Sequence, residues 1–593
     1  MSRLRGPCVV LLSTLVLAGS GCRGRGAPGP TSAAASPTPL GEPAGPPDEA
    51  VASTVRRTLE AARHPWLRWP DLADVVPALR DLYGTEADRL VWFAGDRPHP
   101  ALAGALAAVA GAAERALEPA DYDSERLEAE WKRLQGPSPV PGADRALFDL
   151  AVSVAVLREI GAVHQGRVNP HTLGWGYDVG PKKVDRAALL LAARNGEGVP
   201  ALLDRLEPSY PHYLRNRRVL AHYRALARAG EPPTVPDLPK GRRKLEPGQA
   251  WEGLEAVRAR LVVFGDLAAD APQAATPDGT PLYEGALLDA VMRFQARHVL
   301  DTDGILGAAT IAAMNVPLAA RVRQLELAME RGRWLPPVDR QPTVFVNIPL
   351  FRLWATDPAS GAEPVRMKVV VGKSLENRTP VFVQYMEYVI FRPYWNPPPA
   401  IVENEIVPHA LRDPSYLERE DFEIVASGDE DAVALPATAA NLDAVLAGSL
   451  FIRQRPGPQN SLGLAKFVFP NHENVYMHGT PATRLFLRAR RDLSHGCIRV
   501  EHPTLLAEWV LRDVPGWTRA RIEEAMHADR PTAVKLREPL MVVLFYDTVH
   551  VNSEEVVHFA SDIYGHDKEL DQALARGYPY PESAPSGGPK GRS

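Results

Sequence analysis

One cysteine and two histidines in the C-terminal half of the chain have the residue types and spacing of a nucleophilic site. Cys497 lies in the run Ser494–Arg499, His495 stands two positions before it, and His478 ends an apolar run further upstream. A thiol becomes an effective nucleophile when a neighbouring base or positive charge favours its thiolate. Because near neighbours in a sequence rarely aim their side chains at each other, we predict that His478 is the general base. His495 is predicted to orient the loop through hydrogen bonds.

Two further residues of this run have predicted roles. Acyl transfer places negative charge on a carbonyl oxygen, and backbone N–H groups aimed at that oxygen stabilise it. Gly496 permits a tight turn before the nucleophile, so the N–H groups of Gly496 and Cys497 are predicted to be the oxyanion donors. Arg499 is predicted either to bind a substrate carboxylate or to hold the loop through a salt bridge, and the sequence leaves both open.

The N-terminus predicts export, which bears on the cysteine. Residues 1–22 begin with positive charge, continue through the short apolar run Val9–Ala18 and end in small residues before Cys22. This resembles a bacterial lipoprotein signal in which Cys22 is lipidated, the alternative being simple cleavage nearby. We therefore expect a periplasmic or cell-envelope protein whose membrane contact is an N-terminal lipid anchor. Loss of Cys8 and lipidation of Cys22 would leave Cys497 as a free thiol in an oxidising compartment, the alternative being an inert buried cysteine.

Length and composition predict a multidomain protein that does not bind nucleic acid. A chain of 593 residues suggests about three or four domains. The formal net charge of -5 offers no basic footprint for nucleic acid. Changes in apolar period and in proline and glycine content divide the chain as follows: a signal at 1–22, a disordered tether at 23–50, a helical scaffold at 51–230, a linker at 231–248, a small helical unit at 249–317, a β-rich domain at 340–547 and a disordered tail at 577–593.

The small unit is predicted to contain three helices. Amphipathic helices over 251–261 and 287–298 are followed by a turn at Asp301–Gly304 and by a third helix that opens at Gly307. The run Ala290–Gln295 and the turn resemble the peptidoglycan-binding domain of bacterial wall enzymes. Asp303 and Gly304 could equally be only a structural turn.

The C-terminal domain is predicted to be β-rich with a few helices, which makes the fold class α+β multidomain. Runs of β-branched and aromatic residues predict strands, whereas 412–450 lacks strand alternation and is predicted to be an inserted helical cap. The predicted strands are 343–348, 367–371, 381–385, 388–391, 465–469, 475–478 and 540–547, and the predicted helices are 503–513 and 519–528.

The motifs of this domain resemble those of the bacterial L,D-transpeptidases. His478–Thr480 followed by Ser494–Arg499 looks like the signature of that family, and the likeness extends to the large multidomain branch with a scaffold, a peptidoglycan-binding unit and a cap. The other segments that carry it are Phe345–Pro349, Phe351–Leu353, Val369–Lys373, Thr379–Phe382, Pro393–Pro398, Gly457–Gly463, Phe467 and Asp562–Gly565.

This resemblance implies a reaction. Cys497 would attack the third residue of a peptidoglycan tetrapeptide stem, D-Ala would leave, and a diamino-acid side chain of a neighbouring stem would resolve the thioester into a 3→3 cross-link. No metal or organic cofactor is implied, and carbapenems would be expected to acylate Cys497. Gly479, Tyr394 and Trp395 are predicted substrate contacts, with core packing as the alternative for the two aromatic residues.

Several alternatives stay open. Water as the acceptor would make the protein an L,D-carboxypeptidase, and a protein lysine would make it a lipoprotein-attaching transpeptidase. A non-catalytic peptidoglycan-binding scaffold would explain the modular build but not the pair Cys497 and His478. Two histidines and a cysteine could ligate zinc in a wall peptidase, yet no His-Glu-x-x-His run is present.

Overall fold

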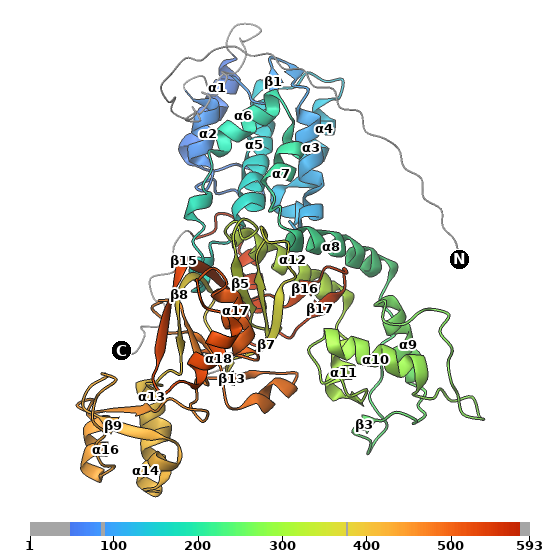
Figure 1. The fold of residues 1–593 in the computed structure, drawn as a ribbon. Coiled ribbons are helices and arrows are strands. Elements are labelled where there is room, and N and C mark those ends of the chain that lie inside the picture. The colour runs from blue at the N-terminus through green and yellow to red at the C-terminus, as the bar shows by residue number, and fades with distance from the viewer. Residues whose placement is uncertain (1–47, 85–88, 375–376, 582–593) are drawn as a thin grey trace, which may run out of the picture. The chain divides into compact units, whose positions relative to one another are not determined.

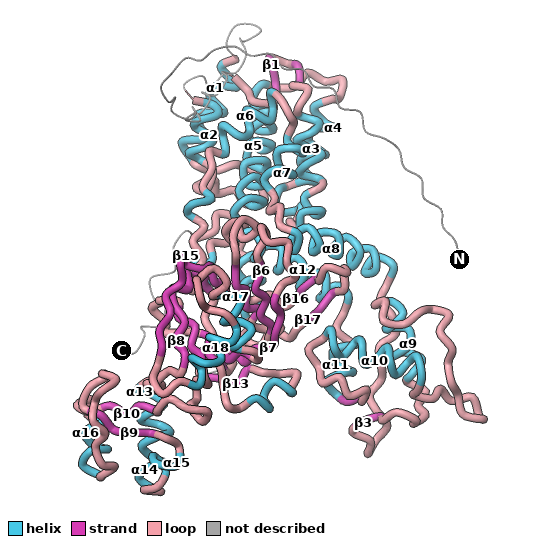
Figure 2. The backbone as a smooth tube through the Cα atoms, viewed as in Figure 1, coloured by secondary structure: helices cyan, strands magenta, loops and turns pink. Residues whose placement is uncertain are grey.

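The computed structural model describes residues 48–84, 89–374 and 377–581. The predicted signal with Cys22, and the predicted tether before Asp48, lie outside the described residues. The described chain combines a helical region, a small helical unit and a β-rich domain (Figure 2), which confirms the predicted α+β multidomain class. None of the helices in these ranges is both long enough and apolar enough to cross a membrane.

The N-terminal helical region is built around α5 (Gly142–Gln165), which is buried along most of its length. A helix with apolar residues on every side must be covered all round, and the neighbouring helices share a hydrophobic core with it (Figure 1). Asp48 caps the first helix by accepting hydrogen bonds from two backbone N–H groups, so this helix begins inside the predicted tether. The other helices are α1 (Glu49–Ala61), α2 (Val76–Tyr83), α3 (Leu102–Ala110), α4 (Ser124–Leu134), α6 (Arg186–Asn195) and α7 (Val199–Leu206). The next helix, α8 (Pro211–Ala229), contributes its buried hydrophobic residues to the core of the β-rich domain.

The small unit is closed by a turn that Gln295 holds. The Gln295 amide donates to Asp303 Oδ1 at 2.9 Å and accepts from the Gly304 N–H at 2.9 Å. The φ of Gly304 is +68°, which favours glycine. Part of the predicted linker belongs to this unit, because its β3 (Lys244–Leu245) pairs with β4 (Leu306–Gly307). The helices are α9 (Leu254–Val263), α10 (Gly285–Arg297) and α11 (Ala308–Met314), and α12 (Leu318–Trp334) follows.

The β-rich domain contains one nine-stranded sheet, in the order β13-β7-β14-β12-β11-β8-β15-β5-β6. Because β6 also pairs with β7, the sheet closes on itself. The two strands predicted at 381–385 and 388–391 form one strand, β8. The strands are β5 (Thr343–Asn347), β6 (Arg352–Thr356), β7 (Val365–Gly372), β8 (Phe382–Phe391), β11 (Ala465–Val468), β12 (Met477–His478), β13 (Asp492–Ser494), β14 (Ile498–Val500) and β15 (Thr532–Phe545). A hairpin of β16 (Val549–Val551) and β17 (Val557–Phe559) lies outside that sheet, and the helices are α17 (Pro503–Val510), α18 (Arg519–His527) and α19 (His566–Ala575).

The insertion is larger than predicted and is not purely helical. Residues between Val402 and Ile452 share a small hydrophobic core of their own, so the insertion begins before the predicted residue 412. It also contains a two-stranded antiparallel sheet that the residue pattern did not reveal, because each strand is only four residues long. Its elements are α13 (Pro399–Ile401), the π-helical turn η5 (Val402–Ile406), α14 (Val407–Arg412), α15 (Tyr416–Arg419), β9 (Phe422–Val425), α16 (Ala439–Leu446) and β10 (Phe451–Gln454).

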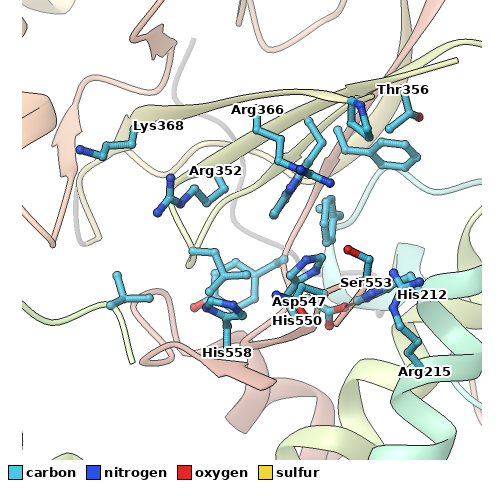
Figure 3. Close-up of a pocket in the computed structure, with 18 of the residues that line it drawn as sticks. His212, Arg215, Arg352, Thr356, Arg366, Lys368, Asp547, His550, Ser553 and His558 are labelled. Atoms are coloured by element: carbon cyan, nitrogen blue, oxygen red, sulfur yellow. Dashed lines mark ion pairs between the residues drawn. The ribbon is translucent and has the colours of Figure 1, made fainter. Parts of the chain in front are cut away.

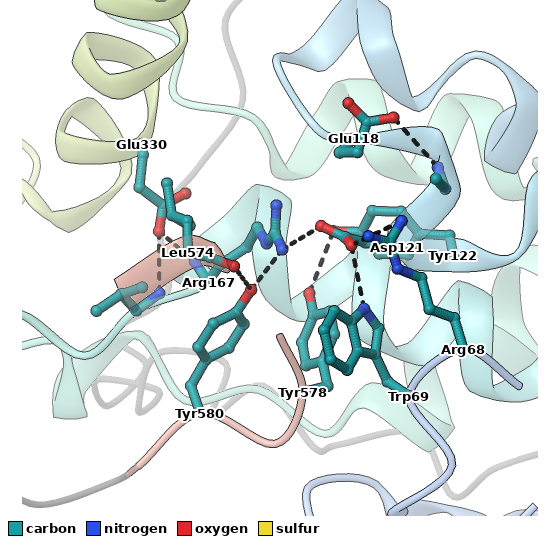
Figure 4. Close-up of polar contacts among 12 residues, drawn as sticks. Arg68, Trp69, Glu118, Asp121, Tyr122, Arg167, Glu330, Leu574, Tyr578 and Tyr580 are labelled. Carbon is teal, nitrogen blue, oxygen red and sulfur yellow. Dashed lines mark hydrogen bonds and ion pairs between the residues drawn. The ribbon is translucent and has the colours of Figure 1, made fainter. Parts of the chain in front are cut away.

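The predicted disordered tail is wrong for residues 577–581, which pack against the helical region (Figure 4). The Tyr578 hydroxyl lies 3.1 Å from that of Tyr122, and the guanidinium of Arg167 donates to the Tyr580 hydroxyl. The two tyrosines provide the buried area and the hydrogen bonds that order this stretch, and the proline- and glycine-rich composition obscured them. Residues 582–593 lie outside the described residues.

Candidate active site

Strand register places the predicted catalytic residues in one neighbourhood. Lys466 on β11 lies opposite His478 on β12, and His478 lies opposite Arg499 on β14. Cys497 directly precedes β14, two positions before Arg499, so the two side chains point to the same side of the sheet. The charges of both Lys466 and Arg499 act on the Cys497 thiol. The structure therefore brings Cys497, His478 and Arg499 together, as predicted, and adds Lys466.

The imidazole of His478 is held in one tautomer. Its Nδ1 lies 2.6 Å from the carbonyl oxygen of Gly479, and because a carbonyl can only accept, Nδ1 carries the proton and Nε2 keeps its lone pair. The residue is 5% exposed. Burial, followed by the positive charge of Arg499, lowers the pKa of His478 to about 3. The imidazole is therefore neutral and able to accept a proton throughout the neutral and mildly acidic range.

Gly479 supports this histidine. The residue is buried, its N–H donates to the Ala465 carbonyl at 2.9 Å, and its carbonyl accepts from His478. Because both backbone polar groups are engaged inside the domain, this placement argues against the prediction that Gly479 contacts substrate.

The thiol of Cys497 is partly buried, with Sγ 3.9 Å from the carbonyl oxygen of Asn474. Burial raises the pKa of the thiol above the ordinary 9.0, although a backbone hydrogen bond from Tyr476 and the charges of Lys466 and Arg499 oppose that shift. Such a thiol is almost wholly protonated at neutral pH. The resting pair is a neutral thiol and a neutral imidazole, so attack on a carbonyl requires a base that removes the proton.

The loop before the cysteine is fixed by Ser494 and Thr379. Gly496 has φ of +116°, in the region that favours glycine. Its N–H donates to Ser494 Oγ at 3.2 Å, and its carbonyl accepts from Thr379 Oγ1 at 2.7 Å. The Gly496 N–H is thus already engaged, which contradicts its predicted role as an oxyanion donor. The Cys497 N–H makes no hydrogen bond within the described residues.

Arg499 keeps one of its two predicted roles, the binding of a substrate carboxylate, because it forms no salt bridge with any described residue. Its buried Nε has no hydrogen-bond partner there. Its pKa is lowered by burial. His495 does not bond within its own loop, because its Nε2 lies 2.8 Å from Glu405 Oε1 in the insertion. His495 therefore connects the nucleophile loop to the inserted subdomain.

The two predicted aromatic contacts have different surroundings. The side chain of Trp395 interacts with the hydroxyl of Tyr476, the residue beside the thiol, and its ring lies 5.9 Å from that of Phe422. The ring of Tyr394 is covered by the guanidinium of Arg453, 4.3 Å from its centroid. Trp395 thus contacts Tyr476, a neighbour of the thiol, whereas Tyr394 contacts Arg453 of the insertion.

Lys466 and Tyr476 are site residues that the sequence interpretation missed. The Lys466 ammonium lies 4.0 Å from the centroid of the Tyr476 ring. Burial lowers the pKa of Lys466. A usable signal was present, because Lys466 is the single charge in an apolar predicted strand, and Tyr476 shares the two-residue period of His478.

A cavity of about 1080 Å³ lies away from this site (Figure 3). Arg352, Arg366 and Lys368, on the paired strands β6 and β7, line one side, and His212 and His550 are among the residues opposite. Neither Cys497 nor His478 lines it. No group of three or more His, Cys, Asp or Glu side chains in the described ranges is arranged to hold a metal ion.

The fold and the site together define a modular protein with a β-rich domain that carries a buried histidine on β12 and a thiol directly before the neighbouring strand β14. Residues 341–523 match the model of the L,D-transpeptidase catalytic domain, and residues 252–314 match that of the "Putative peptidoglycan binding domain". Residues 77–220 match a model described as "Scaffold domain". These matches confirm the resemblance predicted from the motifs. The chain carries an L,D-transpeptidase catalytic domain and a peptidoglycan-binding domain.

A relative and a solved structure carry the same description. A protein of Haemophilus influenzae named "Putative L,D-transpeptidase" is 30% identical over 254 residues, which cover 42% of this chain and 49% of that protein. The chain therefore matches about half the length of this curated relative. The crystal structure of an L,D-transpeptidase (residues 123-326) from Xylanimonas cellulosilytica aligns with 52% of this chain and 100% of that chain at 14% identity, with a TM-score of 0.16 that supports no conclusion.

Proposed function

We propose that the protein is an L,D-transpeptidase that forms 3→3 cross-links in peptidoglycan through a thioester on Cys497. The observation that carries the proposal is the buried imidazole of His478, held by the Gly479 carbonyl on the strand paired with the one that follows Cys497, in a domain that matches the L,D-transpeptidase model. A neutral base is what a protonated thiol needs in order to attack a carbonyl.

The reaction takes two steps. Cys497 Sγ attacks the carbonyl of the third stem residue while Nε2 of His478 takes the thiol proton. The C–N bond to D-Ala breaks and the proton passes to the leaving amine, which leaves a thioester. The side-chain amine of a second stem then attacks the thioester and forms the amide, and its proton returns through His478 to the sulfur.

The surrounding cations suit an acidic peptide. The buried Nε of Arg499 has no partner among the described residues, and its planar guanidinium can bind a stem carboxylate through two hydrogen bonds. Lys466 offers a second positive charge beside the sulfur. Trp395 and, less directly, Tyr394 remain proposed contacts for the donor stem.

The second domain supports a polymeric substrate. The match to the peptidoglycan-binding model supports a location in the cell envelope for the proposed reaction. We propose that lipidated Cys22 anchors the chain there, that carbapenems acylate Cys497, and that no cofactor takes part. Water or a protein lysine could replace the acceptor amine without any change in the acylation step.

The test is incubation of the purified full-length protein with disaccharide tetrapeptide, followed by mass spectrometry. We expect a 3→3 dimer that is absent with Cys497→Ala and nearly absent with His478→Ala. His472→Ala, at an exposed histidine, is the matched control and should retain the product. Hydrolysed tripeptide without dimer would favour the carboxypeptidase, and cross-linking by Cys497→Ala would remove the proposed nucleophile.

A further inference from the structure

The carbonyl of Gly496 is held from outside the nucleophile loop. Thr379, which lies 117 positions away in the sequence, donates from Oγ1 to this carbonyl at 2.7 Å. The same hydroxyl oxygen accepts from the Gly372 N–H, at the end of β7, at 2.9 Å. Thr379 is 1% exposed, so its hydroxyl is satisfied by protein alone.

Tyr564 completes this arrangement from the far end of the domain. Its hydroxyl accepts from the Thr379 N–H at 3.2 Å and donates to the Gly372 carbonyl at 2.6 Å. Burial raises the pKa of Tyr564 to about 12, so the phenol keeps the proton that it donates. A β-carbon on Gly372 would come within 1.9 Å of the Asn377 carbonyl oxygen, so only glycine permits this close approach.

The hydrogen bond from Thr379 to the Gly496 carbonyl also orients the N–H of Cys497, because both groups belong to one planar peptide. The Gly496–Cys497 bond is trans, so the Gly496 C=O and the Cys497 N–H point in opposite directions within one plane. Fixing the carbonyl on Thr379 therefore fixes the direction of the Cys497 N–H. Ser494 Oγ, which donates to the Cys497 carbonyl at 2.6 Å, fixes the next peptide as well.

We propose that Thr379 and Tyr564 are positioning residues that hold the Gly496–Cys497 peptide so that the Cys497 N–H binds the oxyanion. The inference rests on the proposed acyl transfer and deepens it. Without the Thr379 hydroxyl the Gly496–Cys497 peptide can rotate. The Gly496 carbonyl would then point to the position where the oxyanion forms, in place of the Cys497 N–H. The Cys497 thiol does not depend on the orientation of this peptide when it reacts with a reagent that generates no oxyanion.

Two reactions of the purified full-length protein separate these effects. Meropenem acylates a thiol through an oxyanion, whereas iodoacetamide alkylates it by direct displacement. Thr379→Val should lower the acylation rate constant about 10- to 100-fold, which is less than the loss on deleting an oxyanion donor outright. Alkylation at Cys497, measured by mass spectrometry of its peptide, should stay within about twofold because it builds no oxyanion.

Three variants control the result. Thr379→Ser keeps the hydroxyl and should restore acylation. Tyr564→Phe removes both hydrogen bonds of the Tyr564 hydroxyl, leaves the Thr379 hydroxyl in place, and should slow acylation about 2- to 10-fold. Thr343→Val deletes a buried hydroxyl of the same sheet, far along the chain from the loop, and should change neither rate.

The outcomes are distinct. Wild-type acylation by Thr379→Val, or an equal fall in acylation and alkylation, overturns the positioning role. A parent protein that neither meropenem nor tetrapeptide acylates overturns the proposed function and this inference together. Selective loss of acylation with rescue by Thr379→Ser supports both.

Discussion

The neutral resting pair of Cys497 and His478 predicts how the thiol reacts at each pH. Even an ordinary thiol with a pKa of about 8.5 is only about 3% thiolate at pH 7. Burial raises the pKa of Cys497, so its alkylation at pH 7 should run more than about 30-fold below its plateau. The rate should rise about tenfold per pH unit between pH 6 and 8. Acyl transfer should behave differently, because His478 supplies the base only during attack.

The rate of acyl transfer below pH 7 depends on the pKa of His478. An ordinary imidazole with a pKa of 6.5 would be only about 3% neutral at pH 5, which would slow a base-dependent step about 30-fold. The pKa of His478 is lowered to about 3, so the neutral base is retained at pH 5 and lost only as the pH falls toward 3. Acylation by tetrapeptide should therefore lose less than about twofold from pH 7 to pH 5 on account of this group.

The assay measures iodoacetamide labelling of the Cys497 peptide from pH 5 to 10, since the chain also contains Cys8 and Cys22. His478→Gln should leave the midpoint of labelling in place, because it removes no charge. Lys466→Met should move the midpoint upward, because it removes a cation that favours the thiolate. A plateau of fast labelling between pH 6 and 8 that His478→Gln abolishes would refute the reasoning, because it would reveal a preformed thiolate–imidazolium pair.

Three further predictions concern the parts around the site. Glu405→Gln removes an exposed partner of His495 and weakens the contact between the nucleophile loop and the insertion, so the KM for tetrapeptide should rise by less than about fivefold. Glu403→Gln, two positions away and in no ion pair among the described residues, should leave the KM unchanged. Truncation after Arg576 removes the two packed tyrosines and should lower the unfolding temperature of the helical region by on the order of 5–10 °C, whereas truncation after Pro581 should not, as calorimetry can show. Gln295→Ala leaves buried turn groups unpaired and should destabilise the small unit by about 2–3 kcal/mol, measurable as faster local hydrogen exchange at unchanged acylation by meropenem.

The sequence was sufficient to propose Cys497 as the nucleophile and His478 as its base, because these roles depend on residue types. Only one cysteine stands outside the N-terminal segment, and the choice of His478 over His495 needed only the rule that near neighbours do not face each other. Strand parity could also have found Lys466 and Tyr476. The domain classes followed from apolar period and motifs, and the family matches agree with them.

Other features depend on contacts that no local pattern encodes. The Ser494 hydroxyl accepts a hydrogen bond from the Gly496 N–H when the φ of Gly496 is positive. This contact leaves the Cys497 N–H, and not that of Gly496, available to an oxyanion. The hydrogen bond from Thr379 to the same glycine joins residues 117 positions apart, and the hydrogen bond between Tyr564 and Thr379 joins residues 185 positions apart. The extent of the insertion was underestimated because Val402 and Ile406 look like ordinary domain residues until their shared core is seen.

These distant contacts also bear on where the catalytic domain ends. The match to the catalytic-domain model stops at residue 523, yet β15 (Thr532–Phe545) lies inside the sheet, between β8 and β5. Removing β15 would leave two interior strands with unpaired backbone groups, each costly to bury. Beyond β15, Tyr564 reaches back to the strand end that fixes the nucleophile loop. The unit that folds and positions Cys497 therefore extends at least to Tyr564, some forty residues past the region that the catalytic-domain model matches, and the segment Asp562–Gly565 belongs to the architecture of the site.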